Sequence, residues 1–205
     1  MEGFIFPIFY IVVILYSVTI HEVSHGLMAN SLGDSTAKNL GRLSLNPLKH
    51  LDLFGSVLLP FVLYFTTSFV FGYAKPVPYN PDNLTDRKYG PVKVALAGPM
   101  SNFILAILFG LTLRFTPDIF SSVLLQELFS HIVFLNLVLG VFNMFPVPPL
   151  DGHWLLMAFL PPMSPIRNFI YRNTFILFPL FLIVFMIFVS PIIFWLFRFV
   201  TGSAL

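Results

Sequence analysis

Long runs of apolar residues, separated by short polar stretches, dominate the chain. Residues 3–20 read GFIFPIFYIVVILYSVTI and contain no charged side chain. A helix rises about 1.5 Å per residue and the hydrocarbon core of a bilayer is about 30 Å thick, so about 20 apolar residues are needed to cross it. Four segments meet this requirement and are predicted to be transmembrane helices: 4–30, 91–114, 123–145 and 174–199.

A fifth apolar segment, residues 53–72, has Pro60 in its middle and is predicted to enter the membrane and return on the same side. This prediction rests on the tendency of lysine and arginine to stay on one side of a membrane. A full crossing would divide these cations between the two sides. Because lipid-exposed irregular backbone is not tolerated, we expect this segment to be shielded by protein. The re-entrant path puts nine of the eleven cations on one side: Lys38, Arg42, Lys49, Lys75, Arg87, Lys88, Lys93, Arg167 and Arg172.

The polar stretch GRLSLNP, residues 41–47, alternates apolar and polar positions and is predicted to form a short strand. The predicted fold is therefore an α-class, polytopic transmembrane helical bundle with a short membrane-associated β-strand region and a re-entrant segment. We expect one integral-membrane domain over residues 1–205, with a core at 4–160 and a C-terminal transmembrane region at 170–200. The first apolar run is expected to be a retained helix rather than a signal peptide, because Glu2 replaces a basic start and no small-residue cleavage site follows.

Composition supports a protein embedded in the lipid bilayer and narrows its chemistry. Apolar residues make up 57% of the 205 residues and charged residues 10%, whereas soluble domains carry about 25% charged residues. The formal net charge of +2 is too small to indicate a nucleic-acid partner. The chain has no cysteine, so a metal ion would have to be held by histidine, aspartate or glutamate.

The sequence HEVSH places His21, Glu22 and His25 at the end of the first apolar run. On a helix, histidines four residues apart lie on one face and can bind one metal ion, with the intervening glutamate beside the metal-bound water as a general base. Ionisable groups within a membrane helix are functional by default because an unpaired charge there costs at least about 2.5–3.5 kcal/mol. The alternative is a polar patch at a helix end, with the histidines near the headgroups and no metal.

A catalytic zinc site needs a third protein ligand, and Asp151 in NMFPVPPLDGHWLL is the best candidate. Three prolines before it must unwind the preceding helix, and unwound backbone at membrane depth is tolerated where it lines a site. With the re-entrant path, the chain brings Asp151 to the same side as His21 and His25. A full crossing would place it on the opposite side. The alternative role of Asp151 is a helix cap at the membrane surface.

Several motifs in this order resemble the site-2 protease family of intramembrane zinc metalloproteases, in its small prokaryotic form. The motifs are HEVSH, GRLSLNPLKHLD, FGYAKPVPYNP, AGPMSN and FNMFPVPPLDG, and they cover most of residues 10–160. The resemblance implies one zinc ion per chain held by His21, His25 and Asp151, with Glu22 as general base. It also places Asn143 near the site, where it could bind substrate backbone or support an oxyanion, and suggests a similar role for Asn102. From the length of the chain, we expect none of the PDZ or CBS domains of larger relatives.

The resemblance further implies cleavage of transmembrane proteins or peptides, either to release a signalling protein or to clear remnant peptides. It places the zinc-bearing face on the cytoplasmic side of the cell membrane, in agreement with the cations, and GRLSLNP near the substrate. Two alternatives are a zinc transporter and a catalytically silent membrane chaperone on the same scaffold. Transport is disfavoured because the chain has one metal-binding motif and no internal repeat. The sequence carries no signal for an oligomeric state.

Overall fold

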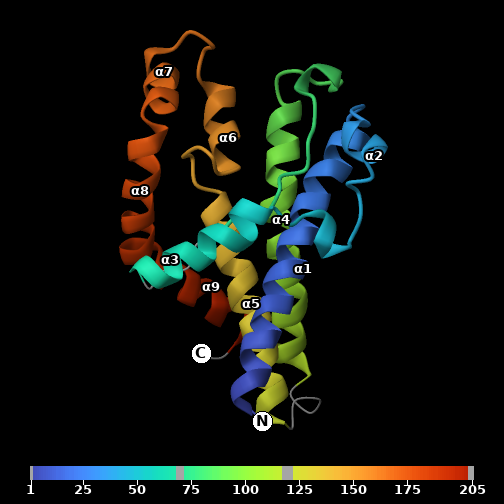
Figure 1. Cartoon of the computed structure of the whole chain (residues 1–205), viewed down its shortest axis with the longest axis vertical. Helices are drawn as coiled ribbons and strands as arrows, with labels where there is room; N and C mark the ends of the chain where they lie inside the picture. Colours follow the sequence, from blue (N-terminus) through green and yellow to red (C-terminus); the bar gives the residue numbers. More distant parts are fainter. Residues whose placement is uncertain (1, 68–71, 117–121, 203–205) are drawn as a thin grey trace.

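The computed structural model describes residues 2–67, 72–116 and 122–202 (Figure 1). Four stretches of helix within these ranges are long and apolar enough to cross a membrane, and they match the predicted spans to within a few residues. The first three belong to single helices, and the fourth is assembled from three consecutive helical pieces. They are α1 (Glu2–Ser31), α4 (Gly90–Phe115), α5 (Val123–Asn143) and the continuous run of α8 (Thr174–Val184), η5 (Phe185–Val189) and α9 (Ser190–Thr201).

The four spans alternate in direction, so that successive connections lie at opposite ends of the bundle (Figure 1). The C-terminal ends of α1 and α5 and the N-terminal ends of α4 and α8 gather at one end, which we call the loop end. Helix α4 packs against both α1 and α5. The loop end also carries the short elements α2 (Thr36–Asn39), η1 (Pro47–Lys49), η3 (Pro81–Asn83), α6 (Gly152–Phe159) and α7 (Pro165–Arg172).

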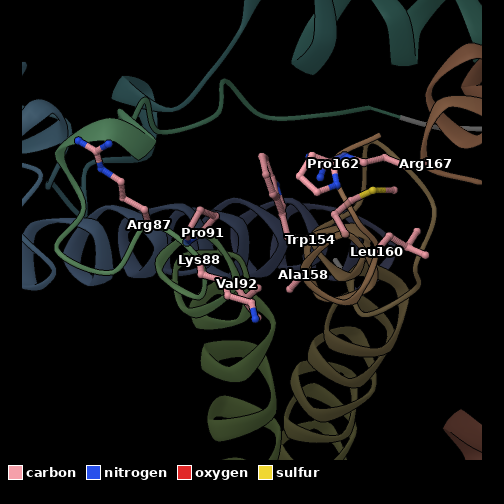
Figure 2. Close-up of a pocket in the computed structure, with 10 residues that line it drawn as sticks. Arg87, Lys88, Pro91, Val92, Trp154, Ala158, Leu160, Pro162 and Arg167 are labelled. Carbon is pink, nitrogen blue, oxygen red and sulfur yellow. The ribbon is translucent and has the colours of Figure 1, made fainter. Parts of the chain in front are cut away.

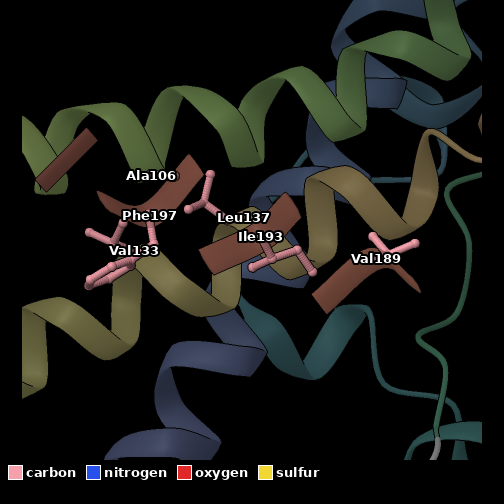
Figure 3. Close-up of a cluster of buried hydrophobic side chains, with 6 residues drawn as sticks. All are labelled: Ala106, Val133, Leu137, Val189, Ile193 and Phe197. Atoms are coloured by element: carbon pink, nitrogen blue, oxygen red, sulfur yellow. The ribbon is translucent and has the colours of Figure 1, made fainter. Parts of the chain in front are cut away.

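A buried apolar cluster joins α4, α5 and the last span (Figure 3). Its six residues come from α4, α5, η5 and α9, and each is less than 5% exposed. In a membrane, close packing of this kind replaces the hydrophobic effect as the source of helix association. The cluster holds α9 against α4 and α5. Helix α8 lies outside the cluster and extends toward the loop end (Figure 1). Its members are Ala106, Val133, Leu137, Val189, Ile193 and Phe197.

The predicted strand at 41–47 is wrong, because no strand occurs in the described parts of the chain. Residues 42–46 instead form irregular backbone whose polar groups meet side chains. His50 Nε2 donates to the carbonyl of Ser44 at 2.8 Å, and Asn46 N–H donates to Ser44 Oγ at 3.3 Å. An alternating pattern needs a neighbouring strand to form a ladder, and here side chains take the place of that partner.

The fifth apolar segment contains η2 (Leu53–Leu58) and α3 (Leu59–Thr67), and α3 runs obliquely across the other helices (Figure 1). Its two ends are held together. Tyr73 N–H donates to the Gly55 carbonyl at 3.0 Å, and Lys75 N–H donates to the His50 carbonyl at 2.8 Å. A full crossing would separate such ends by about 30 Å, so the chain returns to the level at which it left, as the re-entrant prediction requires. Residues 68–71 of that prediction lie outside the described ranges.

The expected shielding of this segment is wrong for the side chains that the structure describes. Leu53 is 81% exposed, Phe61 is 62% exposed and Phe65 is 69% exposed. The expectation assumed irregular backbone, but the segment is helical and satisfies most of its peptide groups internally. Apolar side chains on a helix can face lipid without leaving backbone groups unpaired.

Asp34, immediately after α1, connects the first span to the loop that follows the fifth segment. Its side chain is fully buried and accepts hydrogen bonds from Thr36 Oγ1 at 2.6 Å, Asn80 N–H at 2.7 Å and Asn83 Nδ2 at 2.9 Å. Burial by itself would raise the pKa of Asp34, but these hydrogen bonds outweigh it and lower the pKa below its ordinary value. The ionised carboxylate therefore stabilises the fold.

The topology can be tested with single cysteines, because the chain has none of its own. We expect Ser35→Cys and Thr85→Cys to react with a membrane-impermeant maleimide from the same side in oriented vesicles, since Thr85 N–H donates to the Leu32 carbonyl at 2.8 Å. Ser122→Cys, before α5, should react only from the opposite side. Labelling of positions 35 and 85 from different sides would exclude the re-entrant path.

Asp34→Asn should lower the free energy of unfolding by about 1.5–3 kcal/mol at pH 6, because a charged acceptor is lost from a buried cluster. Since the folded pKa of Asp34 is lowered, its stabilisation is fully present above the unfolded value of 3.8 and disappears as the pH falls through the folded value. The difference between wild type and variant should therefore shrink below pH 4 in detergent unfolding curves. An unchanged difference at pH 3 would contradict this account.

Candidate metal centre

His21 and His25 lie one turn apart on α1, inside the span Phe6–Ser31. At 1.5 Å per residue they sit about 15 Å and about 9 Å along the helix from its C-terminal end. Their side chains are buried, at 6% and 8% exposure, and their Nε2 atoms are 3.0 Å apart. The helix therefore points two imidazoles at one place within membrane depth, near the loop end.

The protonation of each imidazole follows from the partner of its other nitrogen. His25 Nδ1 lies 2.7 Å from the backbone carbonyl of Val94, and His21 Nδ1 lies 2.7 Å from Asn102 Oδ1. Both partners are acceptors, so both Nδ1 atoms carry the hydrogen. In neutral imidazole the Nε2 atoms are then unprotonated, and their lone pairs face each other.

Asp151 completes the cluster from the other side of the cavity. Its Oδ2 lies 3.1 Å from His21 Nε2, and its Oδ1 lies 3.4 Å from His25 Nε2. The buried Oδ2 atom has no hydrogen bond of good geometry.

Local backbone structure explains how Asp151 reaches this position. Helix α5 ends at Asn143, and the proline-containing turns of residues 144–151 lead into α6 at Gly152. A side chain at Gly152 would collide with the backbone carbonyls of Met144 and Phe145. Glycine thus allows the chain to fold back tightly on the end of α5, and this turn carries Asp151 to the histidines.

These three side chains fit a divalent metal ion. One ligand atom from each residue lies within 4.8 Å of the others. Two lone pairs and a carboxylate directed at one point repel each other unless a cation lies between them. Two imidazoles and one carboxylate are also a donor set used by catalytic zinc sites, which keep a further position for water or substrate.

Glu22 lies on the wall of a cavity of about 540 Å³ that also includes the three candidate ligands. Its Oε2 accepts a hydrogen bond from Val77 N–H at 2.8 Å, which orients the carboxylate from the loop after the fifth segment. Other parts of the wall are apolar and come from α5, the turn before Asp151 and α8. They include Leu139, Phe142, Pro149, Leu150 and Phe178.

Comparison with known proteins identifies the family. The model of peptidase family M50 matches residues 117–187, which include Asp151. YwhC of Bacillus subtilis, a candidate zinc metalloprotease, is 38% identical over 159 residues, covering 74% of this chain and 69% of YwhC. The chain belongs to peptidase family M50, a family of zinc metalloproteases. A candidate zinc metalloprotease of Mycolicibacterium smegmatis, Rip2, is 32% identical over 72% of this chain and 56% of its own length. No solved structure matches the chain.

The two asparagines singled out in the sequence occupy different positions relative to the candidate metal centre. Asn143, the last residue of α5, lines the cavity, and its Nδ2 donates to the Leu139 carbonyl at 3.0 Å. Asn102 is fully buried behind His21 instead of lining the cavity. Its Oδ1 faces His21 Nδ1, so its contact is with a candidate ligand rather than with the space a substrate would occupy.

Sequence reasoning did not include the residues that hold Asn102 behind the candidate metal centre. Asn102 Nδ2 donates to Asn136 Oδ1 at 2.9 Å, and Asn136 Nδ2 donates to Ser17 Oγ at 3.0 Å. Asn102 and Asn136 are fully buried, and Ser17 is 4% exposed. A usable signal was present, because each is a polar residue inside an apolar span, where polar groups are rare and find partners.

Gly98 on α4 supplies the space for the two histidines. A Cβ atom there would lie 2.6 Å from His21 Nε2 and in collision with His25 Nε2. Neither ring can move away without losing its Nδ1 hydrogen bond. The close approach of α4 to α1, which provides Val94 and Asn102, therefore depends on glycine at this position.

We expect Gly98→Ala to lower zinc affinity at least about tenfold, because it displaces both imidazoles from their partners. Competition with a fluorescent zinc chelator measures this directly. Gly110→Ala is the matched control, since it lies on the same helix α4 but far from the metal centre, and its Cβ would collide with Val200 of α9. The control should lose stability and keep wild-type affinity. Equal zinc affinity in Gly98→Ala and wild type would contradict the role of Gly98.

Proposed function

We propose that this M50 chain is an intramembrane zinc metalloprotease that hydrolyses peptide bonds within or near the transmembrane segments of membrane proteins. The observation that carries the proposal is the convergence of His21, His25 and Asp151 on one point inside a membrane span, with Glu22 on the wall of the same cavity. One zinc ion per chain, held by these three side chains, would supply Lewis acidity and lower the pKa of water toward neutrality.

In this proposal Glu22 is the general base. Its carboxylate takes a proton from the attacking water and later gives it to the amine of the leaving group. The Val77 N–H bond at 2.8 Å supports this assignment, because it holds one carboxylate oxygen and limits rotation of the side chain. The proton carrier is thereby kept at the cavity wall instead of extending away from it.

The rest of the cavity supports a peptide segment as the substrate. Its apolar wall suits side chains that come from a transmembrane segment, and Asn143 offers an amide that can hydrogen-bond to substrate backbone or to a developing oxyanion. A helix hides its peptide groups in internal hydrogen bonds, so the substrate must unwind locally before a carbonyl can reach the centre. Asn102 acts from behind, as a positioning residue for His21.

We place the metal centre near the cytoplasmic face of the cell membrane. The centre is near the loop end, and nine of the eleven lysines and arginines belong to the segments that gather at that end. Such cations remain on the cytoplasmic side. Transport of zinc is less well supported, because His21, His25 and Asp151 are the one cluster of potential metal ligands within the described residues, and a transport path needs more than one polar station.

The proposal is tested by comparing purified wild type, Glu22→Gln and Asp151→Ala for zinc content and for cleavage of single-span substrates. Wild type should bind one zinc ion and cleave. Glu22→Gln should keep the zinc and lose at least about 100-fold in rate, because the general base is removed. Asp151→Ala should lose zinc as well as cleavage.

Glu127→Gln is the matched control, because it makes the same chemical change at an exposed position near the start of α5. It should bind zinc and cleave like wild type. Cleavage by Glu22→Gln at the wild-type rate would exclude Glu22 as the base. Zinc flux through wild-type vesicles without any cleavage would favour the transporter instead.

A further inference from the structure

A second cavity, of about 340 Å³, lies beside the metal centre at the loop end (Figure 2). Three cationic residues contribute to its lining: Arg87 and Lys88 immediately before α4, and Arg167 on α7. Figure 2 shows Trp154 of α6 between the α4 side and Arg167, with the Arg87 side chain extending outward from the rim. We call this cavity the basic pocket.

The cations of the basic pocket are not neutralised by the protein. Among the described residues, one lysine or arginine forms an ion pair. It is Lys93, which pairs with Asp86 at 3.0 Å. The Asp86 carboxylate also accepts hydrogen bonds from the backbone N–H groups of Lys88 and Tyr89. These bonds orient it toward the backbone of its own turn. Arg87, Lys88 and Arg167 make no ion pair with any residue that the structure describes. A pocket with three such cations favours an anion.

The apolar lining of the basic pocket indicates an amphiphilic anion. Pro91, Val92 and Met157 are buried in its wall, and Leu160 and Trp154 are half-buried there. A small inorganic anion would gain nothing from these contacts. A glycerophosphate headgroup, with its phosphate near the cations and its glycerol and first methylenes against the apolar wall, would use both kinds of surface. Tryptophan is also common at the headgroup level of membranes.

The position of the pocket agrees with such a ligand. Arg87 and Lys88 immediately precede the span that starts at Gly90, which puts them at headgroup level. Helix α7 begins after Met163, which is 91% exposed, and it presents Ile166 and Phe169, each 58% exposed. An exposed apolar face of this kind on a helix with arginines is typical of a helix that lies in the membrane interface. Arg167 therefore approaches the pocket from an element that itself contacts lipid.

From these observations we propose that the basic pocket binds the phosphate of an anionic glycerophospholipid, with Lys88 and Arg167 as the main contacts and Arg87 at the rim. The site is separate from the metal centre and does not depend on the proposed protease activity. It shares one residue with the catalytic cavity, since Trp154 lines both. The occupant would lie against α6, whose N-terminus follows Asp151 directly.

Trp154 provides the reporter for a binding experiment. The chain has two tryptophans, and Trp195→Phe, at an exposed position on α9, leaves Trp154 alone. This variant is titrated in an uncharged detergent with dihexanoyl-phosphatidylglycerol, with dihexanoyl-phosphatidylcholine and with inorganic phosphate. We expect a saturable change in emission with phosphatidylglycerol at a concentration at least about fivefold lower than with phosphatidylcholine. Inorganic phosphate should produce no saturation in that range.

Two arginines on α7 form a matched pair of variants in this background. Arg167→Ala should weaken phosphatidylglycerol binding at least about fivefold, whereas Arg172→Ala, which removes the same charge outside the pocket, should stay within about twofold. Arg167→Lys should restore most of the affinity if loss of the charge, rather than misfolding, weakens binding. Native mass spectrometry of the same proteins in an equimolar lipid mixture gives a second readout, as retained phosphatidylglycerol over phosphatidylcholine.

Three results would overturn the proposal. Equal affinity for phosphatidylglycerol and phosphatidylcholine, in Trp154 emission or in native mass spectrometry, would mean that the pocket does not select an anionic headgroup. Saturation by inorganic phosphate at the same concentration as the lipid would assign the pocket to a soluble phosphate. Equal weakening by Arg172→Ala and Arg167→Ala would mean that diffuse surface charge attracts the lipid.

Discussion

The need to provide hydrogen-bond partners for two histidines inside a membrane span determines much of this structure. Both Nδ1 atoms face the buried contact with α4, where they cannot reach water, so each requires a fixed acceptor from the protein. The two acceptors, the Val94 carbonyl and Asn102 Oδ1, both belong to α4. Asn102 in turn needs Asn136 on α5 and Ser17 on α1. The association of these three helices therefore follows from the hydrogen bonds that the two histidines require as well as from apolar packing.

The same constraint explains how far the sequence could predict the fold and the site. Length and hydropathy identified four spans, and the i, i+4 spacing put His21 and His25 on one face, because both follow from helix geometry alone. The proximity of Asp151 followed from counting crossings. The position of Asn102 could not be derived in this way, because it depends on how α4 is rotated about its own axis relative to α1. That rotation is set by contacts such as the one at Gly98, which no pattern along a single helix reveals.

The two expectations that failed have a common physical origin. Both treated a segment by its own pattern without asking where its backbone hydrogen bonds would go. Residues 42–46 alternate like a strand, but their backbone groups are engaged by side chains such as Ser44 and His50. The fifth apolar segment was expected to need protein around it, but its described part, residues 53–67, is helical and satisfies most of its own peptide groups. In each case the available hydrogen-bond partners, rather than the sequence periodicity, decided the local structure.

The loop after the fifth segment links the stability of the fold to the proposed chemistry. Asp34 accepts hydrogen bonds from Asn80 and Asn83 of this loop. The loop is also anchored at Lys75, which donates to the His50 carbonyl, and at Thr85, which donates to the Leu32 carbonyl. Val77 lies between these anchors, and its N–H donates a hydrogen bond to Glu22. The orientation of the proposed base is therefore set by a polar loop outside the spans, and not by α1, on which the base resides. The same loop lines the cavity with Pro76, Val77 and Tyr79, so the anchors that keep the proposed base in place also limit how far the cavity can widen on this side.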